Sequence, residues 1–199
     1  MRRLVSALAI GLAAVLLPAR ADAHLVTTGL GPVYDGIGHL LASPEDLVPA
    51  IALALYAGLR GASGGRRALL LLPLAWLAGG LIGLRAPVTF PFPLGAVSFM
   101  VLGVLVATDL ALPGGAVAAL AIALGLAFGF ENGAALAVAG GGARNLIGIA
   151  AALFVVVALV SAFVVALERP WKRIAVRVAG SWIAAVGLLL IGWSLRGAR

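Results

Sequence analysis

Long apolar runs alternate with short polar segments along most of the chain, and this pattern predicts six transmembrane helices. The runs follow a polar, glycine-rich segment at residues 24–38. The predicted helices cover residues 44–59, 68–84, 94–112, 115–130, 146–167 and 174–195. Because these helices and their short connections use most of the chain, we expect an all-α polytopic membrane helix bundle without a separate soluble domain.

The first 23 residues have the three parts of a secretory signal. Arg2 and Arg3 form a basic start, an apolar core covers residues 4–17, and the sequence Ala-Asp-Ala ends at Ala23. The apolar core is shorter than the roughly 20 residues that a membrane span needs. We therefore expect cleavage after Ala23, which leaves residues 24–199 as a single transmembrane domain. An uncleaved first helix is the alternative.

Composition excludes most other classes of protein. Hydrophobic residues make up 63% of the chain, charged residues 11%, and the mean hydropathy is +1.18, whereas a soluble domain carries about 25% charged residues. The absence of cysteine excludes disulfides, iron–sulfur clusters and thiolate metal sites. The net charge of +7 does not indicate nucleic-acid binding, because no basic patch is interleaved with aromatic residues. The expected partner is the lipid bilayer.

The basic residues also predict an orientation, because cytoplasmic loops of membrane proteins are enriched in arginine and lysine. If the mature N-terminus is translocated, more bases lie inside than outside, in agreement with the predicted signal. Those inside are Arg60, Arg66, Arg67, Arg169, Lys172, Arg173 and Arg177, and those outside are Arg85, Arg144, Arg196 and Arg199. We expect a multi-pass protein of the bacterial inner membrane with both mature termini extracytoplasmic.

The segment "HLLASPED", residues 39–46, gathers one of the two histidines and two of the seven acidic residues at the start of the first predicted helix. One interpretation is structural. Ser43 can cap a helix, Pro44 suits its first position, and the carboxylates of Glu45 and Asp46 favour the positive end of the helix dipole.

The other interpretation is a cation site at a broken transmembrane helix. A helix over residues 44–59 is about 24 Å long at about 1.5 Å per residue, which is shorter than the hydrocarbon core of about 30 Å. The preceding residues 34–41 are apolar enough to enter the membrane and supply the missing length. Pro44 and Pro49 loosen the backbone, as in the discontinuous helices that form ion sites in transporters.

A second polar cluster, Glu131 and Asn132, ends the fourth predicted helix on the same side of the membrane. Ionisable residues at membrane depth usually face the bundle interior or a water-filled path. We therefore expect the two clusters to converge on one cation, although a polar helix end is the structural alternative. Asp35 and His24 are secondary candidates, the latter through its α-amine and imidazole as a mature N-terminus. Asp109 is expected in a loop on the opposite side.

The chain contains 27 glycines, which are concentrated within or beside the predicted helices. In a bilayer, small residues allow helix backbones to approach closely. Most of these glycines are therefore expected to form helix-packing surfaces. They do not form a phosphate-binding loop, because residues 142–148 lack the Lys-Ser/Thr ending of that motif.

The stretch "HLLASPEDLVPAIALALYAGLRG", followed by "GGRRALLLLPLAWLAGGLIG", resembles the HupE/UreJ family of small membrane proteins. The first-helix motif of that family is a histidine, five residues, then Asp-His. His39 matches the first position, Glu45 replaces the aspartate, and Asp46 stands at the second histidine. A later motif resembles His-Gly-x-Ala-His-Gly. Here the stretch is "FGFENG", in which Gly129 and Gly133 match.

In that second motif, Phe128 and Asn132 occupy the histidine positions. The resemblance implies about six helices and secondary transport of nickel or cobalt, in the context of hydrogenase or urease maturation. It implies no tightly bound cofactor, because the metal is the cargo. Since imidazole suits nickel and cobalt whereas carboxylates suit magnesium, calcium or manganese, the departures predict weaker selectivity for nickel or another cargo. The candidate metal ligands are His39, Glu45, Asp46, Glu131 and Asn132, with Asp35 and His24 as secondary candidates.

Two other classes of function compete with transport. A membrane accessory or scaffold protein would keep the fold after losing the metal site. An enzyme is not expected, because a membrane hydrolase needs a nucleophile, a base and a path for water. Ser43 is the hydroxyl nearest to His39 in the sequence, and helix capping explains it better.

Overall fold

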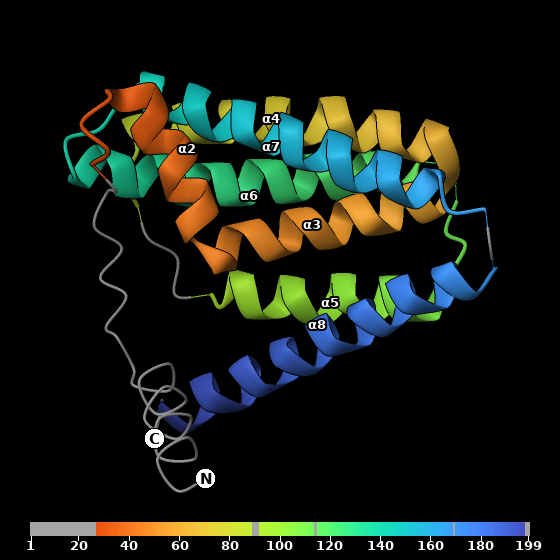
Figure 1. Cartoon of the computed structure of the whole chain (residues 1–199). Coiled ribbons are helices and arrows are strands. Elements are labelled where there is room, and N and C mark those ends of the chain that lie inside the picture. Colours follow the sequence, from red (N-terminus) through yellow and green to blue (C-terminus); the bar gives the residue numbers. More distant parts are fainter. Residues whose placement is uncertain (1–26, 89–91, 114, 169, 198–199) are drawn as a thin grey trace, which may run out of the picture.

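The computed structural model describes residues 27–88, 92–113, 115–168 and 170–197, which form helices and no strands (Figure 1). The predicted signal segment and His24 lie outside the described residues. The helices are α2 (Pro32–Ala42), α3 (Pro44–Leu59), α4 (Gly61–Arg85), α5 (Leu94–Thr108), α6 (Ala116–Val138), α7 (Ala143–Val165) and α8 (Pro170–Gly197).

The predicted all-α membrane bundle is confirmed. Four helices, α4, α6, α7 and α8, are long and apolar enough to cross a membrane, and the α2–α3 pair satisfies the same criteria as one bent span. α5 is apolar but shorter, with 15 residues. The six predicted helices therefore correspond to α3 through α8, and the number of complete spans among the described residues is four or five.

No helix was predicted in the polar, glycine-rich segment at residues 24–38, but α2 forms over its second half and continues through the stretch that was expected to enter the membrane. α2 and α3 meet at Ser43 with a bend of 76°. This confirms the expectation of a broken helix. Ser43 occupies the capping position, but its side chain makes no capping hydrogen bond, so that prediction is wrong in detail.

α3 lies at the centre of the molecule, between the α4–α6–α7 group and the α5–α8 pair (Figure 1). Its small apolar side chains explain this position, because Ala52, Ala54 and Ala57 are fully buried together with Leu53 and Tyr56. α3 begins and ends where the sequence predicted. It connects to α4 through Arg60 and Gly61, and the positive φ of Gly61 (83°) suits this reversal of the chain.

Glycines hold α4 and α6 together at backbone contact, as the sequence predicted. A Cβ atom built at Gly129 would lie 2.1 Å from the carbonyl oxygen of Trp76, and one at Gly133 would lie 2.1 Å from that of Gly80. On the other helix, a Cβ at Gly83 would lie 2.2 Å from the carbonyl oxygen of Phe130. Since lipid tails are as apolar as leucine, such close van der Waals packing, and not burial from water, drives this association.

The glycine contacts also set the rotation of α6. Phe128 and Asn132 each precede a glycine that faces α4, so they lie about 100° around the helix from that contact. Both side chains are buried, and they point into the space beside the N-terminal end of α3. The packing of α4 against α6 thus places Asn132 beside the break between α2 and α3.

Candidate cation site

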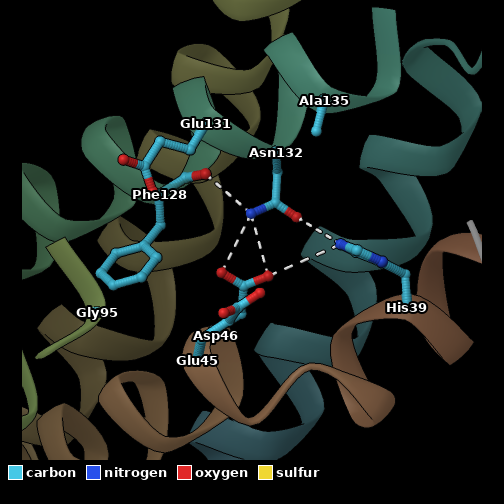
Figure 2. Close-up of a pocket in the computed structure, with 8 residues that line it drawn as sticks. All are labelled: His39, Glu45, Asp46, Gly95, Phe128, Glu131, Asn132 and Ala135. Carbon is cyan, nitrogen blue, oxygen red and sulfur yellow. Dashed lines mark hydrogen bonds and ion pairs between the residues drawn. The ribbon is translucent and has the colours of Figure 1, made fainter. Parts of the chain in front are cut away.

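Three helices bring a histidine, an aspartate and an asparagine together at the α2–α3 break. His39 lies in the last turn of α2, Asp46 in the first turn of α3, and Asn132 within α6. Figure 2 shows the Asn132 amide between the Asp46 carboxylate and the His39 ring. The two polar clusters of the sequence therefore meet, although residues 39 and 132 are 93 positions apart.

Asn132 connects the other two side chains by hydrogen bonds. Its Nδ2 donates to both carboxylate oxygens of Asp46, at 3.2 and 3.1 Å, and to the carbonyl oxygen of Phe128 at 3.0 Å. Its Oδ1 lies 3.1 Å from Nε2 of His39. Because an amide oxygen only accepts, Nε2 of His39 carries the hydrogen in this arrangement. Nε2 also lies 3.8 Å from Oδ2 of Asp46.

The three side chains line a cavity of about 240 Å³. Glu45 of α3 and Glu131 of α6 line it as well, and the remaining walls are Gly95, Phe128 and Ala135. Three carboxylates and one imidazole give the cavity a negative character when the carboxylates are ionised, which suits a cation. Asp46 and Asn132 are only 5% and 6% exposed, so they lie at the protected end of the cavity.

Glu131 and Asn132 lie within α6 and not at its end. They were expected to end the fourth helix at residue 130, but α6 continues to Val138. A polar pair inside a membrane helix is costly without partners, and here Asn132 finds them in α2 and α3. Figure 2 shows the Glu131 carboxylate turned away from the Asn132 amide, so Glu131 lines the cavity without joining the hydrogen-bonded group.

The secondary candidate Asp35 lies outside the cavity. Its carboxylate accepts hydrogen bonds from the backbone N–H of Thr28 at 2.6 Å and from the Thr28 hydroxyl at 2.7 Å. These contacts fix the segment that precedes α2. Asp109, expected in a loop on the opposite side, caps the far end of α5 and pairs with arginines.

Two walls of the cavity and the environment of a third were not predicted from the sequence. Gly95 and Ala135 carry no chemical signal that could have placed them there. Phe128 was noted only for its position in the motif; its ring stacks on Trp76 with centroids 5.5 Å apart and planes 15° apart. This buried aromatic pair fills the space beside Asn132 with hydrocarbon.

The geometry limits how a cation can bind. Within the described part of the chain, no group of three or more His, Cys, Asp or Glu side chains is arranged to hold a metal ion. A cation in the cavity would therefore need the amide oxygen of Asn132, water molecules or a movement of Glu45 or Glu131 to complete its coordination. The Asn132 oxygen becomes available only when it releases the N–H of His39.

The family model described as HupE / UreJ protein matches residues 12–190, which is most of the chain. No curated protein and no solved structure matches. The positions at which the family resemblance places histidines, 39, 46, 128 and 132, all line the cavity. In this chain they hold His, Asp, Phe and Asn.

Proposed function

Because this chain belongs to the HupE/UreJ family, we propose that it is a secondary transporter of divalent cations and that His39, Asp46 and Asn132 bind the cargo. The observation that supports this proposal best is their convergence from three helices at a break within the membrane bundle. Broken helices place ion-binding groups near the middle of the bilayer in many transporters. Transport by this chain alone is gradient-driven, since its sequence has no phosphate-binding motif for ATP.

The family implies nickel or cobalt as the cargo, but the donor atoms of this chain favour a broader range of divalent cations. One imidazole remains at the four motif positions, while Glu45, Asp46 and Glu131 supply oxygen atoms. Nickel and cobalt favour imidazole, and manganese and magnesium favour carboxylate, carbonyl and water oxygens. The proposed transporter therefore discriminates weakly between nickel or cobalt and oxygen-preferring ions such as manganese.

Uptake into proteoliposomes tests the proposal. Purified protein in vesicles that contain a metal-sensitive dye is expected to admit nickel, cobalt and manganese faster than protein-free vesicles do. The matched control is Asp46→Asn protein, incorporated at the same density. If wild-type protein, Asp46→Asn protein and empty vesicles admit every ion at the same rate, the chain is not a transporter of these ions.

Restoring a histidine is expected to change the selectivity. In Asn132→His, an imidazole replaces the amide between His39 and Asp46, so nickel gains a second nitrogen ligand. We expect the affinity for nickel to rise about 10-fold relative to that for manganese. Changes to the groups around a metal commonly alter its affinity by about this factor. Calorimetric titration with both ions measures this ratio. An unchanged or lower ratio would mean that residue 132 does not contact the ion.

For localisation, the proposal is a bacterial inner membrane in which the cavity opens to the extracytoplasmic side. The signal segment and the distribution of basic residues support this orientation. A reporter enzyme that is active only outside the cytoplasm, fused to the C-terminus, is expected to be active. Activity of a cytoplasmic reporter at the same position would reverse the assignment. Supply of metal to hydrogenase or urease maturation follows from the family alone.

The second candidate is a membrane accessory protein that binds a protein partner and transports nothing. The specific observation in its favour is that the described residues hold no ready-made group of three ionisable metal ligands. This function predicts that Asp46→Asn leaves activity in the cell unchanged, while substitutions on the exposed face of α8 disrupt a complex. The proteoliposome experiment separates the two candidates.

A further inference from the structure

A charged cluster lies at the other end of the molecule from the cavity. It consists of Arg60 after α3, Asp109 at the C-terminal end of α5, and Arg173 in α8. The Arg60 guanidinium forms an ion pair with the Asp109 carboxylate, and its Nη2 donates to the Asp109 carbonyl oxygen at 3.1 Å. Arg173 pairs with the other carboxylate oxygen of Asp109 at 3.2 Å. One carboxylate therefore joins three helices.

Backbone hydrogen bonds extend this cluster across the same interface. Arg173 donates to the carbonyl oxygen of Leu59, at the end of α3, at 3.2 Å. The Tyr56 hydroxyl donates to the carbonyl oxygen of Leu110 at 2.9 Å, and the Arg60 guanidinium lies 5.4 Å from the centre of the Tyr56 ring. These contacts tie the C-terminal end of α3 to the residues that follow α5.

The cavity and the cluster occupy opposite ends of the α3–α5 contact. α3 and α5 both run from the cavity to the cluster (Figure 1). Glu45 and Asp46 of α3 and Gly95 of α5 line the cavity, and Arg60 and Asp109 follow the last residues of the same helices. The separation is one length of α3, about 24 Å. The α3–α5 interface therefore has the cavity at one end and the ion pairs of Asp109 at the other.

α5 and α8 form a pair that meets the rest of the molecule mainly at α3. Their backbones touch at glycines. A Cβ at Gly103 would lie 2.3 Å from the backbone nitrogen of Ala184, and one at Gly187 would lie 2.4 Å from that of Met100. Such close contacts make the pair a rigid unit. If this unit rotated slightly against α3, then α3 and α5 would move apart at one end of their interface and move closer together at the other.

We propose that Arg60, Asp109 and Arg173 form a gate that closes the end of the α3–α5 contact opposite the cavity. When the gate opens, the α5–α8 pair rotates on α3 and the cavity closes, so the bound cation is exposed to each side in turn. This proposal rests on the proposed transport function for its purpose. The gate itself is a conformational property that can be measured without any cargo.

A substitution at Asp109 can test the gate without disturbing the backbone. Its backbone is left-handed, with φ 52°, a conformation that asparagine tolerates as readily as aspartate does. Asp109→Asn therefore removes the charge without straining the turn. It leaves two arginines facing a neutral amide, so the gate loses both ion pairs while the shape of the side chain is kept.

Thiol labelling can report on both ends, because the natural chain has no cysteine. Leu59→Cys reports on the gate, because Leu59 is only 5% exposed and its carbonyl oxygen accepts a hydrogen bond from Arg173. Ala135→Cys reports on the cavity, since Ala135 is exposed and lines it. Each reporter is labelled with a hydrophilic methanethiosulfonate in nanodiscs, where both membrane faces are accessible, in the presence and absence of Asp109→Asn.

We expect Asp109→Asn to raise the labelling rate of Leu59→Cys at least 5-fold and to lower that of Ala135→Cys by a similar factor. Asp35→Asn, the same substitution at a carboxylate that belongs to neither the cavity nor the cluster, should change neither rate. Arg173→Gln is a second variant that weakens the gate from α8 and should act in the same direction.

Two outcomes would overturn the gate. If Leu59→Cys is labelled no faster in either variant, the cluster does not control access. If the labelling rate of Leu59→Cys rises while that of Ala135→Cys stays constant, the cluster only holds neighbouring helices together locally and does not control the cavity. Failure of transport gives a different result, in which labelling at the two ends changes reciprocally but the vesicles admit no cation.

Discussion

Asp46→Asn is expected to reduce cation binding by at least about 10- to 100-fold and to stop uptake. Asp46 is the most buried carboxylate at the cavity, at 5% exposed. A negative charge in such a place attracts a cation more strongly than one in water does. Changes that only touch the surroundings of a metal already cost about 10- to 100-fold in affinity, so loss of a ligand charge should cost at least as much.

Asparagine is the informative replacement because it keeps the shape of the side chain and one acceptor oxygen for Nδ2 of Asn132. Alanine would leave a buried amide with one partner fewer, which costs about 1–3 kcal/mol and could weaken the fold. Asp35→Asn is the matched control, because it makes the same change of charge at an exposed carboxylate outside the cavity. Wild-type binding by Asp46→Asn, measured by calorimetry, would remove Asp46 from the proposed site.

Gly129→Ala is expected to destabilise the bundle by about 3 kcal/mol, the upper end of the usual cost of overpacking. Alanine gains about 1 kcal/mol of helix propensity over glycine, but the new Cβ would lie 2.1 Å from the backbone oxygen of Trp76. Because the contacted atom belongs to a backbone, it cannot turn aside as a side chain could. α4 and α6 must separate, and the steric cost exceeds the gain in propensity.

Thermal unfolding in detergent measures this effect. Gly115→Ala is the control at the N-cap of the same helix, since Gly115 has a negative φ and a Cβ there meets nothing within 4 Å. It should lower the midpoint only slightly, because the exchange of glycine for alanine at an N-cap costs at most about 1 kcal/mol. Gly129→Ala should also weaken cation binding, because a displaced α6 carries Asn132 away from Asp46. A midpoint equal to that of Gly115→Ala would mean that the two helices are not packed through Gly129.

The pattern of apolar runs was sufficient to predict the class of fold and the position of α3, because a membrane requires long apolar helices whatever their packing. It could not predict where α6 ends. Glu131 and Asn132 resemble a helix end in the sequence, and only the hydrogen bonds to Asp46 and His39 explain why the helix continues through them. Those partners are far away in the sequence.

α2 was missed for a related reason. Its glycines suggest an irregular segment, yet Gly36 and Gly148 bring α2 and α7 to backbone contact, and a side chain at either position would clash. The helix is stabilised by a neighbour more than a hundred residues away. By contrast, the signal segment and the basic residues were sufficient to place both polar clusters on one side of the membrane. Whether the clusters meet depends on the order and packing of the helices, which the sequence does not show.

The shortness of α3 and α5 has a consequence for the surrounding lipid. At 16 and 15 residues they are about 24 and 22 Å long, several ångströms less than an average hydrocarbon core, whereas α8 next to them has 28 residues. The bilayer beside α5 must thin, or α8 must tilt, to relieve this hydrophobic mismatch. A thinner apolar layer lowers the dielectric barrier to an ion, so under the proposed transport function the rate of uptake should depend on the thickness of the membrane.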